Sequence, residues 1–141
     1  YRVFFINGAL ILRHMIISDS WNVHAKDRAR YMAEHPAAVA EERALFEQPE
    51  PFGPQVRDVL HGVRDRMGLD FFGMDFGVTR DGEVVLFEAN ATMNFFPFSP
   101  DPQFAHLKRA YPPAQRAFRD LLGLPPAPHG TAGLRVQFEP A

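Results

Sequence analysis

Two short turn signals constrain the fold of this chain most strongly. Asn7-Gly8 and Asp81-Gly82 each stand between apolar runs rich in β-branched and aromatic residues. Both dipeptides favour tight β-hairpin turns, because the central residues of such turns need a positive φ. The sequence therefore predicts two hairpins, the first with strands at about 1–6 and 9–17 and the second over residues 69–91.

Helical patterns fill the segments between and after the hairpins. The apolar spacing and the breaks at prolines predict helices over 25–34, 37–48, 55–67 and 102–122. We expect a break or kink in the last helix at Pro112 and Pro113. Elements in this order predict an α+β domain, with an antiparallel sheet built from two hairpins and helices packed on one face.

Composition narrows the class of protein. The chain has 141 residues, of which 46% are hydrophobic, so one domain with a real core is expected. A net charge of −2 gives no indication of nucleic acid or an anionic membrane as partner. There is no cysteine, and no apolar run approaches the roughly 20 residues of a membrane span. These features favour the cytoplasm.

The two ends of the chain differ. Tyr1 stands directly in an apolar, strand-like run, and we therefore expect the chain to be the excised C-terminal part of a longer protein. The predicted domain covers residues 1–123. Residues 124–141 form a Pro- and Gly-rich tail that we expect to be loosely ordered.

The second hairpin is expected to place two acids opposite each other. If Asp81-Gly82 is a two-residue loop, Arg80 opposes Glu83, and the same count outward sets Asp75 opposite Glu88. By period-2 alternation, one face carries four residues and the other faces the core. The first face holds Gly73, Asp75, Glu88 and Asn90; the second holds Met74, Phe76, Phe87 and Ala89.

Opposed like charges destabilise a sheet, which suggests a cation between Asp75 and Glu88. Mg²⁺ prefers oxygen ligands, to which the Asn90 amide oxygen adds one, and it usually takes the rest of its shell from waters and substrate phosphates. Glycines at 73 and 77 are expected to leave room beside Asp75 for a ligand. The alternative is that both acids simply lie on the solvated face of an amphipathic hairpin.

The first hairpin suggests an anion site by the same reasoning. With Asn7-Gly8 as the loop, Arg2 opposes Arg13. Two adjacent guanidinium groups repel unless an anion bridges them, and arginine is well suited to phosphate. The alternative is two edge arginines that extend into water.

The segment GLDFFGMDFGVTRDGEVVLFEANATMN resembles the metal-binding end of ATP-grasp enzymes, which have an Asp in one strand, a DG turn and Glu-x-Asn in the next strand. Asp75 matches the first metal ligand, Glu88 the bridging ligand and Asn90 the third. The opening YRVFFINGALILRH resembles the preceding strand pair, which carries phosphate-contacting arginines such as Arg2 and Arg13.

The resemblance implies the Mg–ATP-binding half of a ligase. Such an enzyme activates a small-molecule or peptide carboxylate with ATP and Mg²⁺ through an acyl-phosphate, which an amine or another nucleophile attacks. Arg2, Arg13 and Asn90 would contact the nucleotide. The implied partners are the missing N-terminal half of the ATP-grasp domain, with its adenine pocket and glycine-rich loop, and the other domains of the parent. We therefore expect this chain alone to be inactive.

Departures from the family pattern leave alternatives open. Gly73 stands where many members have a basic residue, and Ala91-Thr92-Met93 stand where many have a proline shortly after Glu-x-Asn. A non-catalytic ATP-grasp-like binding or scaffold module is therefore one alternative. Another is a plain α+β interaction domain in which the acidic pair is fortuitous.

Several other side chains are ambiguous. Phe95, Phe96 and Phe98 are expected either to form a lid or to cover the edge of the core. His24 is expected at the surface or near the substrate, and Trp21 in the core or as a hydrophobic staple.

Overall fold

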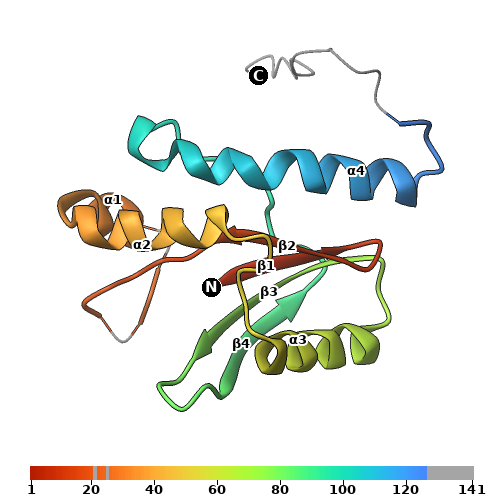
Figure 1. The fold of residues 1–141 in the computed structure, drawn as a ribbon, viewed down its shortest axis with the longest axis horizontal. Helices are drawn as coiled ribbons and strands as arrows, with labels where there is room; N and C mark the ends of the chain where they lie inside the picture. Colours follow the sequence, from red (N-terminus) through yellow and green to blue (C-terminus); the bar gives the residue numbers. More distant parts are fainter. Residues whose placement is uncertain (21, 25, 127–141) are drawn as a thin grey trace.

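The computed structural model describes residues 1–20, 22–24 and 26–126. It confirms the predicted α+β class. Four antiparallel strands form one sheet in the order β2-β1-β3-β4 (Figure 1). The strands are β1 (Arg2–Ile6), β2 (Ala9–His14), β3 (Phe71–Val78) and β4 (Val84–Asn90).

The helical elements are α1 (Asp27–Arg30), η1 (Met32–Glu34), α2 (Pro36–Glu47), α3 (Pro54–Met67), η2 (Pro102–Ala110) and α4 (Tyr111–Leu121), where η marks a 3₁₀ helix. Prolines stand at the starts of α2 and α3, where their missing N–H costs no helical hydrogen bond. In the described part of the chain, no helix is both long and apolar enough to cross a membrane.

The first hairpin turn has the conformation that the sequence predicts. Asn7 and Gly8 have φ values of 47° and 77°, which are the left-handed values that a tight hairpin turn needs. Gly68 has a φ of 61° and ends α3. The expected break near Pro112 and Pro113 is the junction where η2 passes into α4.

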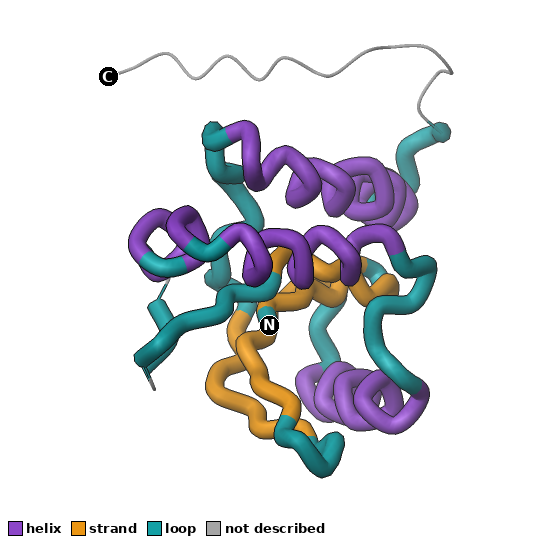
Figure 2. Tube along the Cα trace, turned by 60° about the vertical axis from the view of Figure 1, so that its left-hand side comes forward, coloured by secondary structure: helices purple, strands orange, loops and turns teal. Residues whose placement is uncertain are grey.

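Helices cover both faces of the sheet, which corrects the expectation of one covered face (Figures 1 and 2). Leu60 of α3 packs with Val3 and Phe5 on one side. Ala114 of α4 packs with Phe4 on the other. The physical reason is the apolar run from Val3 to Ile6: all four residues are fully buried, and successive side chains point to opposite faces.

A buried network of charged side chains links α1, α2 and η2 to the residue that follows β2. Both carboxylate oxygens of Glu42, on α2, accept hydrogen bonds from Arg28 at 2.7 and 2.8 Å. The same oxygens contact the Met15 backbone N–H at 2.9 Å and Nε2 of His106 at 2.8 Å. Glu42 is fully buried, so these partners replace all of its water.

We predict that Glu42→Gln lowers the free energy of unfolding by about 3 kcal/mol, because it leaves the Arg28 charge buried without its carboxylate. Urea denaturation followed by circular dichroism measures this. The control is Glu41→Gln, an exposed neighbour on the same helix, which should change stability by less than about 0.5 kcal/mol. Equal effects of the two substitutions would contradict a stabilising role for the network.

Candidate functional site

The second hairpin brings Asp75 and Glu88 opposite each other, as predicted, but by a different route. Its loop has three residues, since the Thr79 N–H donates to the Glu83 carbonyl at 2.8 Å and Gly82 has a φ of 84°. The pairing of Arg80 with Glu83 is therefore wrong. A bulge between Asp75 and Phe76 on β3 and their partners on β4 then restores the predicted register at Asp75 and Glu88.

Phe87 is the extra residue at this bulge, and its position differs from the prediction. Phe76 pairs with Leu86 and Asp75 with Glu88, so Phe87 has no partner on β3. Its side chain was expected in the core but is 68% exposed. It lies against Gly77, on the Asp75 face of the sheet, because a bulge interrupts the alternation of side chains.

Asp75 is neutralised by an arginine from the neighbouring hairpin. Arg2 lies opposite Asp75 in the β1–β3 pairing. Its Nε and Nη2 donate to Oδ1 and Oδ2 at 2.7 and 2.6 Å, a two-point ion pair. The carboxylate raises the pKa of Arg2 through these hydrogen bonds. The ion pair with Arg2 thus balances the negative charge of Asp75, and no metal ion is needed for that.

Glu88 and Asn90 lie beside this pair. Nδ2 of Asn90 donates to Glu88, and Oδ1 accepts hydrogen bonds from the backbone N–H and the hydroxyl of Thr92 at 2.8 and 3.0 Å. Within the described residues, no three His, Asp or Glu side chains gather as a metal-binding group.

The donor set of Asp75 and Glu88 fits a hard cation such as Mg²⁺, because each carboxylate keeps free lone pairs. Asn90 fits only after its amide group turns by a half rotation, since its oxygen now faces Thr92.

The two arginines of the first hairpin are not directly opposite each other. A bulge between Arg2 and Val3 pairs Arg2 with His14, so Arg13 has no partner on β1. Arg13 is buried, and its Nε and Nη2 donate to the carbonyls of Phe95 and Pro97 at 2.6 and 2.8 Å. Its donors therefore bind carbonyl groups of the 95–98 loop, and the prediction that Arg13 lies opposite Arg2 is wrong.

The aromatic loop mostly covers the core. Phe95 is buried, and the ring of Phe98 lies 4.2 Å from the Arg13 guanidinium carbon, within the range of a cation–π contact. Phe96 is half exposed. Of the two expectations for this loop, covering the core edge is the one this packing supports. Trp21 lies outside the described residues, as does the tail from residue 127.

Gly73 makes room for protein side chains, which corrects the expectation of open surface at that position, whereas the space beside Gly77 is bounded only by the Phe87 ring. A Cβ on Gly73 would lie 2.7 Å from the Met93 sulfur and 3.0 Å from the ring of Phe4. A Cβ on Gly77 would meet only the far end of the exposed Phe87 ring, at 3.2 Å.

We predict that Gly73→Ala destabilises the protein by about 1–3 kcal/mol, because the new methyl group overpacks the core between Met93 and Phe4. Gly77→Ala is the matched control on the same strand and face, and should cost less than about 1 kcal/mol because Phe87 can swing away. Thermal unfolding of both variants measures the difference. If Gly77→Ala proves the more harmful, the packing described for the two glycines is wrong.

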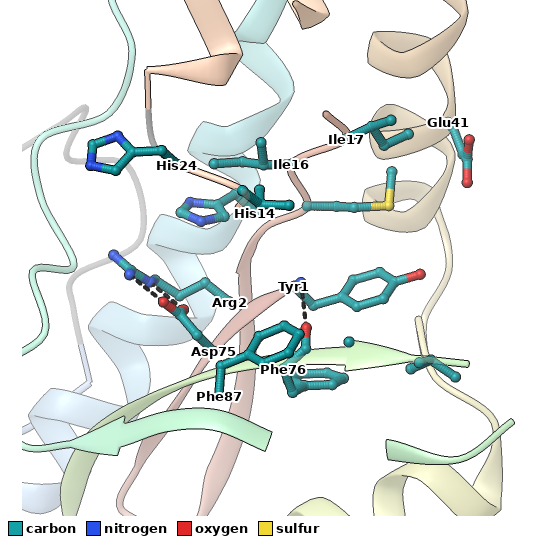
Figure 3. A pocket seen from close by; sticks show the side chains of 14 residues that line it. Tyr1, Arg2, His14, Ile16, Ile17, His24, Glu41, Asp75, Phe76 and Phe87 are labelled. Carbon is teal, nitrogen blue, oxygen red and sulfur yellow. Dashed lines mark hydrogen bonds and ion pairs between the residues drawn. The ribbon is translucent and has the colours of Figure 1, made fainter. Parts of the chain in front are cut away.

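A cavity of about 520 Å³ opens beside the Arg2–Asp75 pair (Figure 3). It lies between the segment after β2, the middle of α2 and the β3–β4 hairpin. Its lining is Tyr1, Arg2, His14, Met15, Ile16, Ile17, Val23, His24, Glu41, Asp75, Phe76, Gly77, Val78 and Phe87. The sequence reading of the site missed His14, Ile16 and Phe87, because the two bulges that place His14 and Phe87 give no signal in residue pattern alone.

His14 sits in a positive environment at this cavity. Burial lowers its pKa well below 6.5, and the nearby Arg28, Arg13 and Arg2 lower it further. The imidazole is therefore neutral at pH 7, and its protonation would place a further positive charge among three arginines.

We predict that His14 makes the protein less stable in mild acid. The unfolded chain binds a proton near pH 6.5 while folded His14 does not, so stability is complete above that pH and falls as pH drops below it. The slope of this contribution is at most about 1.4 kcal/mol per pH unit. His14→Gln should flatten the dependence below pH 6.5, measured by urea unfolding. An unchanged profile would contradict the burial of a neutral imidazole.

Comparisons with protein-family models, with curated proteins and with solved structures find no match.

Proposed function

We propose that this chain supplies the metal-binding half of a Mg–ATP site in an ATP-dependent carboxylate ligase. The observation that carries the proposal is the cross-strand pairing of Asp75 with Glu88. This register supports the reading of the D…DG…ExN pattern as a cation site, because it sets the two carboxylates on neighbouring strands, with Asn90 hydrogen-bonded to Glu88.

In this proposal each residue has a distinct task. Asp75 and Glu88 hold the cation from two adjacent strands, and Asn90 orients Glu88. Arg2 uses two of its five N–H donors on Asp75, which leaves others for a phosphate or carboxylate oxygen. Bound Mg²⁺ would neutralise charge on the phosphate oxygens. Arg13 acts at a distance, through its charge, because carbonyl groups occupy its donors.

One observation favours the alternative of a non-catalytic ATP-grasp-like binding or scaffold module. Arg2 already satisfies Asp75, and the Asn90 oxygen faces Thr92, so this part of the fold is stable without a metal. The two functions differ in whether the carboxylates bind a cation at all.

Metal binding separates these functions. We predict that the chain binds Mn²⁺, used as a spectroscopic substitute for Mg²⁺, more tightly with ATP than without it. Glu88→Gln should weaken the binding at least about tenfold, because a ligand charge is lost while the Arg2–Asp75 pair stays intact. Electron paramagnetic resonance of free Mn²⁺ gives the measurement.

Asp81→Asn is the matched control, since it removes an exposed carboxylate from the tip of the same hairpin. Equal Mn²⁺ affinity in Glu88→Gln and Asp81→Asn would refute the metal site and favour the scaffold module. In the full-length protein, Asp75→Ala should abolish ATP hydrolysis, whereas this chain alone should show none.

A further inference from the structure

The cavity beside Arg2 has a mixed lining (Figure 3). Arg2, His14 and Asp75 contribute polar groups to it, and Ile16 and Phe87 contribute apolar surface. A volume of about 520 Å³ is in the range of small-molecule sites. An amphipathic ligand with one polar group and an apolar body matches this lining.

The charges around His14 favour an anionic ligand group beside it. Of the carboxylates that line the cavity, Asp75 is paired with Arg2, and Glu41 lies exposed on α2. Arg13 does not line the cavity but is buried, and it contacts two carbonyl oxygens and the ring of Phe98, with no carboxylate paired to it among the described residues. Burial lowers the pKa of His14, and the charges of Arg28, Arg13 and Arg2 lower it further.

We propose that this cavity binds a small carboxylic acid with an aliphatic or aromatic body. Its carboxylate accepts hydrogen bonds from the remaining N–H groups of Arg2 and from His14, and its body packs between Ile16 and Phe87. The inference deepens the proposed function, because it names the class of acid that the ligase would activate.

The test uses isothermal titration of the 141-residue chain, without nucleotide or metal, against butanoate, hexanoate and octanoate. Each added methylene should strengthen binding about fourfold until the walls are filled. Hexanamide, which has the same body without the charge, should bind at least about tenfold more weakly than hexanoate. Inorganic phosphate tests whether an anion alone is sufficient, and it should bind more weakly than octanoate.

Two variants locate the site. Phe87→Ala should weaken octanoate binding about tenfold and leave the fold intact, because the Phe87 side chain is exposed. Val85→Ala is its control, because Val85 is an exposed apolar residue of the same strand outside the cavity lining. In the unmutated chain, octanoate should shift the imidazole resonances of His14, a readout that needs no substitution.

Equal affinity along the acid series, equal binding of hexanamide, or equal effects of Phe87→Ala and Val85→Ala would overturn the inference. These results are independent of Mn²⁺ and ATP binding. If octanoate binds but Mn²⁺ does not, the ligase proposal is refuted and the acid site is supported. If Mn²⁺ binds but octanoate does not, only the acid site is refuted.

Discussion

The rest of the structure depends on β1, whose side chains are buried on both faces of the sheet. Val3, Phe4, Phe5 and Ile6 are fully buried, and the strand pairs with β2 on one side and β3 on the other. A strand with apolar side chains on both faces needs a cover on each, which α3 and α4 supply. Because Arg2 directly precedes this run, its guanidinium emerges where the covered part of the sheet ends. The candidate site is therefore located at the margin of the core.

Stability and the proposed chemistry use different properties of the same groups. Arg2 balances the charge of Asp75 at the sheet, and Glu42 balances that of Arg28 in the helical layer. In both cases a buried or half-buried charge has its partner in a distant part of the sequence. Asp75 keeps lone pairs that Arg2 does not use, so a cation could be added without dismantling the pair.

The sequence predicted the local features well and the long-range ones poorly. The Asn7-Gly8 turn follows from the positive φ values that few other residues adopt. The opposition of Asp75 and Glu88 was predicted from a loop one residue too short, and a bulge compensated for the error. The Glu42 network was invisible, because its partners Arg28 and His106 lie 14 and 64 positions away. Only the tertiary fold brings such residues together.

The bulge at Phe87 separates the tip of the second hairpin from its base. Pairing on the loop side of the bulge follows the three-residue loop, whereas Asp75 and Glu88 pair in a different register on its other side. A gain or loss of one residue in the loop can therefore be absorbed between the loop and the bulge. The tip can accept insertions and deletions over evolutionary time, or grafted loops in protein engineering, while the two carboxylates keep their places.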